Sequence, residues 1–220
     1  MNLHTFLQEQ LAAVPVAKAN YDKLKQIKTK EFDFGDYKIY VHFNPARAVS
    51  SLAKLDAKSI AERPCFLCAK NRIEGQTAID FKGKYDICIN PFPICDEHFT
   101  VVSKMHEPQN IIGKVRDFID LAQAYPDFIA LFNGAKSGAS APDHMHFQLV
   151  NKDYFPYTVD TPMPGVVEKV VLISADADAL EQQLTAEINK RQLEGELPAS
   201  HVNLFCEYKN DEWVVTIFPR

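Results

Sequence analysis

Residues 133–148, NGAKSGASAPDHMHFQ, join a loop of small side chains to a His-x-His-x-Gln motif. Side chains two apart in a strand share a face, so a strand here would align His144, His146 and Gln148 about 6–7 Å apart. The apolar residues that alternate with them would then point into a core. The glycine and small residues of the loop would let a phosphate group approach the backbone. The pattern therefore favours a chemical site over a packing surface.

Cys65 and Cys68 form a C-x2-C pair, a spacing that lets two thiolates bind one zinc ion from a tight turn. The alternative is two buried or redox-active thiols. A tetrahedral zinc site needs two further ligands, and the candidates are His98, His106 and His144. The chain has five cysteines and its N-terminus lacks the features of a signal peptide, so we expect reduced thiols.

A third motif runs from Asn90-Pro-Phe-Pro to the stretch HFTVVSKMH at 98–106. With the His-x-His-x-Gln motif, it resembles the histidine-triad superfamily, in particular the transferase branch in which glutamine replaces the third histidine. The segment 65–72, CFLCAKNR, resembles galactose-1-phosphate uridylyltransferase. The loop at 138–142 is similar to one shared by that enzyme and the diadenosine tetraphosphate phosphorylases. The resemblance covers residues 37–150.

This resemblance implies a histidine-triad-like α+β fold with a mostly antiparallel sheet. It implies that His146 is a nucleophile that becomes nucleotidylated and that Gln148 holds phosphate oxygens. The ligands that it implies for a structural zinc ion are Cys65, Cys68, His106 and His144, with His98 as the second choice for the fourth position. The residues that it implies near the nucleoside or the phosphates are Asn90, Asn133, Ser137, Ser140 and Arg47.

The function implied is transfer of a nucleoside monophosphate through a covalent nucleotidyl-histidine. The donor would be a nucleoside diphosphate sugar or a dinucleoside polyphosphate, and the acceptor phosphate or a sugar phosphate. A histidine must be neutral to attack phosphorus, so its other ring nitrogen should donate to a fixed acceptor such as a backbone carbonyl. Hydrolysis of nucleotide conjugates is one alternative. The other is a zinc-stabilised nucleotide-binding protein without catalysis.

Two features depart from the uridylyltransferase pattern. Asp143 separates Pro142 from His144, whereas in that enzyme the first histidine follows the proline directly. That enzyme is also a longer chain with two related halves and a second metal site, and no second half is visible here. The resemblance therefore does not extend to specificity for a sugar phosphate.

Composition and charge exclude some classes of function. The formal charge of −5 and the lack of a basic run argue against nucleic-acid binding. No apolar run approaches ~18 residues, so we expect no membrane span and a cytoplasmic protein. Relatives form homodimers, which makes a homodimer the expectation. The chain stops directly after an apolar strand, which suggests that the natural sequence continues beyond Arg220.

Periodicity and turn signals predict one α+β domain over residues 1–220. The expected helices are 3–27 with an interruption at Pro15, 51–61, 110–124 and 177–194. The expected strands are 37–43, 86–90, 99–103, 127–132, 143–150, 166–173, 202–208 and 212–218.

Overall fold

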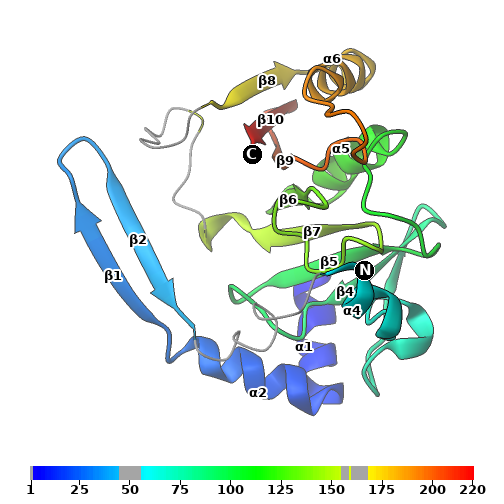
Figure 1. Cartoon of the computed structure of the whole chain (residues 1–220). Coiled ribbons are helices and arrows are strands. Elements are labelled where there is room, and N and C mark those ends of the chain that lie inside the picture. The colour runs from blue at the N-terminus through cyan, green and yellow to red at the C-terminus, as the bar shows by residue number, and fades with distance from the viewer. Residues whose placement is uncertain (1, 45–55, 155–158, 160–167) are drawn as a thin grey trace.

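The computed structural model describes residues 2–44, 56–154, 159 and 168–220. Its centre is an eight-stranded antiparallel sheet with the order β3-β4-β5-β7-β6-β9-β10-β8 (Figure 1). The strands of this sheet are β3 (Ile79–Phe81), β4 (Tyr85–Ile89), β5 (His98–Ser103), β6 (Phe128–Asn133), β7 (His146–Asn151), β8 (Val170–Ser174), β9 (Val202–Lys209) and β10 (Glu212–Pro219). The expected α+β class with a mostly antiparallel sheet is confirmed.

A separate hairpin, which projects from the rest of the chain in Figure 1, consists of β1 (Lys28–Asp33) and β2 (Lys38–Phe43). The α-helices are α1 (Leu3–Ala13), α2 (Pro15–Leu24), α4 (Ala57–Glu62), α5 (Val115–Ala124) and α6 (Ala177–Asn189). Short 3-10 helices are η2 (Ala69–Asn71) and η3 (Lys152–Tyr154). Pro15 separates α1 from α2 because proline fits the first position of a helix and lacks the N–H that a helix interior needs. Among the described residues, none of the helices has the length and apolar character to span a membrane.

Helices α1 and α5 lie on the face of the sheet opposite His146 and Gln148. Phe147 in β7 packs on Phe118 of α5, with ring centroids 5.3 Å apart, and Phe99 in β5 packs on Phe6 of α1 at 6.5 Å. Because side chains alternate along a strand, His146 and Gln148 point to the face opposite Phe147. Met145, Phe147 and Leu149 all belong to the main core, as the alternation predicts. One face of the sheet thus packs into the main core, and the other carries His146 and Gln148 together with a smaller apolar cluster of Cys95, Ile129, Leu131 and Val150.

The largest difference from the sequence expectation concerns His144. The expected strand 143–150 begins only at His146, because residues 141–144 form a turn in which the His144 N–H donates to the Ala141 carbonyl. His144 therefore does not share the strand face with His146 and Gln148. The turn sends its ring in another direction, and this separates the two histidines of the motif.

Other boundaries shift for local reasons. The helix expected at 110–124 starts at Val115, because a turn at 111–114 contains Gly113 with a φ of 77°. The helix expected at 177–194 ends at Asn189. Two strands are not predicted from the sequence: β1, whose charged residues carry little strand signal, and the short β3. Residues 51–55 and 166–167, which belonged to an expected helix and an expected strand, lie outside the described residues.

Candidate active site

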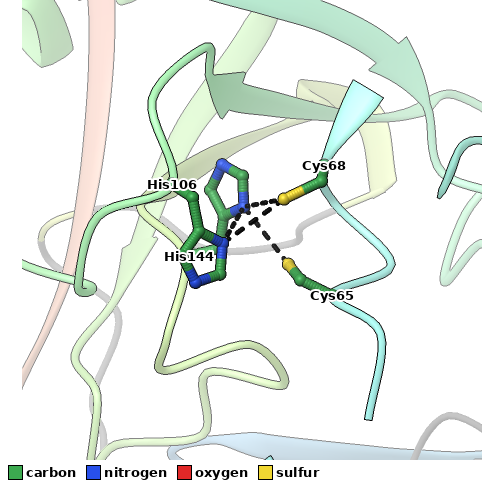
Figure 2. A group of neighbouring side chains, drawn as sticks. All are labelled: Cys65, Cys68, His106 and His144. Atoms are coloured by element: carbon green, nitrogen blue, oxygen red, sulfur yellow. Dashed lines mark hydrogen bonds between the residues drawn. The ribbon is translucent and has the colours of Figure 1, made fainter. Parts of the chain in front are cut away.

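Four side chains from three distant segments converge beside the sheet (Figure 2). Cys65 and Cys68 come from the turn before η2, His106 follows β5, and His144 lies in the turn before β7. Their ligand atoms all lie within 4.8 Å of one another. The measured separations are 3.2 Å from Cys65 Sγ to His144 Nδ1 and 3.3 Å from Cys68 Sγ to His106 Nδ1, and the two Nδ1 atoms are 3.3 Å apart.

This geometry fits a zinc ion. Zinc–sulfur bonds of about 2.3 Å and zinc–nitrogen bonds of about 2.0–2.1 Å in a tetrahedron put neighbouring ligand atoms about 3.3–3.8 Å apart. The His144 Nε2 lies 2.8 Å from the Ser103 carbonyl, which only accepts, so Nε2 carries the ring proton and Nδ1 keeps the lone pair that a metal needs. Burial lowers the pKa of His144, which favours the same neutral form.

The surroundings of the cluster are part open and part closed. Cys65 and His144 are buried, whereas His106 is exposed, and a cavity of about 520 Å³ borders Cys68 and His106. The guanidinium of Arg63, which borders the same cavity, donates to the Asp143 carboxylate. A metal ion here would border this cavity.

His146 has the hydrogen bond that a neutral nucleophile requires. Its Nδ1 lies 2.8 Å from the carbonyl oxygen of His144, so Nδ1 carries the proton and Nε2 keeps the lone pair. Burial is the largest influence on the ring and lowers the pKa of His146 to about 4. The side chain is therefore neutral near pH 7. The partner is a backbone carbonyl, the kind of acceptor expected from the sequence.

His98 contacts Gln148 instead of the cysteine pair. The Ile94 N–H donates to His98 Nδ1 at 3.3 Å, which places the ring proton on Nε2, and Nε2 donates to Gln148 Oε1 at 2.7 Å. The oxygen of the Gln148 amide is thereby engaged. Its nitrogen is the end that is able to donate to a phosphate oxygen.

The remaining candidates are spread around this centre. Asn90, at the end of β4, accepts from the Phe92 N–H and donates to Thr100, so its amide shapes the proline-rich turn. The Ser137 hydroxyl donates to the Ser200 carbonyl at 2.9 Å and thus has a structural partner. Asn133 ends β6, and Ser140 is exposed in the loop before His144. Arg47 lies outside the described residues.

Sequence reasoning missed Gln109. This residue is fully buried, and its side chain makes hydrogen bonds to the backbone of Asn133 and His146. It stands in the segment EPQN, between a proline and an asparagine, where a glutamine typically belongs to an exposed loop. No periodicity marks it, because its burial comes from strands distant in the sequence.

Residues 6–151 match the family described as Domain of unknown function (DUF4922), and the chain belongs to that family. The fold is similar to that of yeast Ap4A phosphorylase Apa2, with a TM-score of 0.55 and 15% identity over 94% of this chain and 81% of that one. The same enzyme in complex with Ap4A gives a TM-score of 0.50 with 17% identity over 95% and 79% of the two chains. A DUF4931 family protein from Bacillus cereus gives a TM-score of 0.50 with 18% identity over 66% and 85%. The curated proteins contain no match to this sequence. The fold of this chain is thus similar to that of yeast Ap4A phosphorylase Apa2.

Proposed function

We propose that this protein is a nucleotidyltransferase or phosphorylase that uses His146 as its nucleophile. The substrate would be a nucleoside diphosphate sugar or a dinucleoside polyphosphate. The observation that carries the proposal is the contact of His146 Nδ1 with the His144 carbonyl, which holds a buried, neutral imidazole with its lone pair on Nε2. A protein that only binds nucleotides has no need for a histidine outside the candidate metal cluster directly beside the candidate ligand His144.

The reaction has two steps. The Nε2 lone pair of His146 attacks the α-phosphorus, the bond from phosphorus to the bridging oxygen breaks, and the phosphorylated leaving group departs with that electron pair. The ring becomes a cation, which the Nδ1–H bond to the His144 carbonyl stabilises. A phosphate oxygen of the acceptor then attacks phosphorus, and the N–P bond breaks to return its electron pair to Nε2. Such a sequence gives ping-pong kinetics.

The surrounding groups position the substrate and neutralise charge. His98 binds the oxygen of the Gln148 amide, which leaves the amide nitrogen of Gln148 as the donor. Its N–H groups are suited to bind non-bridging phosphate oxygens. Glutamine has no proton to shuttle, which favours transfer to a phosphate acceptor over hydrolysis by water. Positioning and electrostatics would supply most of the rate enhancement.

Zinc would have a structural role. Cys65, Cys68, His106 and His144 would fill a tetrahedral coordination sphere and leave no open position for substrate. The ion would fix the backbone at His144, whose carbonyl orients the His146 ring. Cluster and nucleophile thus share one residue.

The fold of yeast Ap4A phosphorylase supports a dinucleoside polyphosphate as one donor to test. The experiment is intact-protein mass spectrometry after incubation with diadenosine tetraphosphate and with uridine, guanosine and adenosine diphosphate sugars. We expect an adduct of one nucleoside monophosphate, lost in His146→Ala and kept in His42→Ala, which alters an exposed histidine of the hairpin. An adduct that persists in His146→Ala would refute the nucleophile. No adduct with any donor would refute covalent transfer from these substrates.

A further inference from the structure

Gln109 is a buried polar side chain with its hydrogen-bonding capacity directed at backbone atoms. Its Nε2 donates to the carbonyls of Asn133 at 2.9 Å and His146 at 3.0 Å. Its Oε1 accepts from the His146 N–H at 2.8 Å. Both backbone groups of the candidate nucleophile are therefore bound by one side chain, which has no exposed surface.

The reason for this arrangement lies in the separation of two strands. β6 and β7 pair from Phe128↔Asn151 to Leu131↔Gln148, and then the ladder ends. Continuing the register would set Asn133 opposite His146, but the amide of Gln109 stands between them and takes the backbone bonds that a paired strand would take. The Gln109 amide thus takes the place of a backbone peptide group at the point where β6 and β7 separate.

Backbone hydrogen bonds of residues 107–109 also hold the segment 142–146. The Gln109 N–H donates to the Pro142 carbonyl at 3.0 Å, and the Met145 N–H donates to the Glu107 carbonyl at 2.7 Å. Residues 107–109 therefore run beside the entire segment 142–146. That segment holds the His144 carbonyl, which accepts from the His146 ring.

We propose that Gln109 is a positioning residue that sets the aim and the tautomer of His146. The consequence for activity rests on the proposed function, whereas the geometric role does not. The Gln109 side chain binds the N–H and the carbonyl of His146. Its backbone N–H binds Pro142, in the turn that contains the His144 carbonyl, the acceptor for the His146 ring. A loss of this brace would let the imidazole rotate away from the His144 carbonyl, and a misplacement of about 1 Å is enough to slow a positioned reaction about 100-fold.

The test compares Gln109→Met, which removes the amide, with Gln10→Met as the matched control. Gln10 is also buried, and its amide binds Thr77 far from the site. Histidine labelled with ¹⁵N reports the tautomer of each ring by NMR, and His146→Ala assigns the His146 signals. For each variant, adduct formation with diadenosine tetraphosphate, the zinc content and the midpoint of unfolding are measured as well.

We expect both variants to lose stability, but only Gln109→Met should mix or broaden the His146 tautomer signals and slow adduct formation about 10- to 100-fold. The milder Gln109→Asn keeps the amide and should show the same changes to a smaller extent, which covers the case in which the methionine variant fails to fold. Wild-type His146 signals in both Gln109 variants would refute the proposal. Because NMR needs no substrate, this readout decides the role of Gln109 even where the wild-type chain forms no adduct.

Discussion

The Arg63 guanidinium donates a hydrogen bond of 2.6 Å to the carboxylate of Asp143. Arg63 lies two residues before Cys65, and Asp143 directly precedes His144, so this ion pair joins two segments that contribute residues to the candidate metal site. The side chains are only 21% and 16% exposed, which limits screening by solvent. Asp143, which departs from the uridylyltransferase pattern, therefore has a structural role here.

The ion pair should affect zinc affinity. We expect Asp143→Asn to weaken zinc binding about 10-fold, because groups outside the coordination sphere orient the ligands. Competition with a chromophoric chelator measures this affinity. Asp22→Asn is the control, since Asp22 pairs with Lys18 on an exposed helix surface. Equal zinc affinity in Asp143→Asn and the wild type would show that the pair does not hold the site.

Zinc content should show which of two neighbouring histidines, His98 or His106, is a ligand of the ion. His106→Ala removes a member of the cluster and should lose the ion, whereas His98→Ala alters a residue bound to Gln148 and should retain one zinc per chain. Elemental analysis of the purified variants gives the stoichiometry. Zinc retained in His106→Ala and lost in His98→Ala would reverse the assignment.

Gln148→His should change the fate of the nucleotide. A histidine at this position adds a group that transfers protons, so water becomes a better acceptor. We expect the ratio of hydrolysis to transfer to rise about 10-fold or more, within the range of a single acid–base group. Chromatography of products formed with and without phosphate measures the ratio. An unchanged ratio would mean that Gln148 does not select the acceptor.

Asp117 should contribute to stability in a pH-dependent way. Burial of the carboxyl alone would raise its pKa, but hydrogen bonds from Lys84, Lys82 and Tyr85 outweigh that effect, and the pKa is lowered. A lowered pKa in the folded state stabilises the protein above the unfolded value of about 3.9, and this contribution is lost as the pH falls below it. Asp117→Asn should therefore cost about 1–2 kcal/mol at pH 7.

Urea unfolding at pH 7 and at pH 3 tests this expectation. The difference between Asp117→Asn and the wild type should shrink at pH 3, because the Asp117 carboxyl of the unfolded chain, with a pKa of about 3.9, binds a proton there and so stabilises the unfolded state. The exposed Asp22 gives a matched variant, Asp22→Asn, which should differ little from the wild type at either pH. A difference for Asp117→Asn that stays constant with pH would rule out the charge as its cause.

Alternation predicts the core side chains of β7 because a strand that buries one face must repeat every two residues. The same rule fails for His144, since the turn after Pro142 rotates the backbone before the strand begins. Gln109 is beyond any local rule, because its partners lie 24 and 37 residues away and only the tertiary fold brings them together. Local pattern thus gives the chemistry of the motif, whereas the supports of the site depend on long-range contacts.

Cys68 and His106 are 38 residues apart, and so are His106 and His144. An ion bound to all three would act as a cross-link that closes two loops in succession. In the chain-entropy description of such links, closing one loop of this length costs about 4 kcal/mol of conformational entropy. The ion would bind only after the three segments have met, so its binding would be a late step of folding that holds these segments together. Metal supply would then control how long the newly made chain stays open to proteolysis.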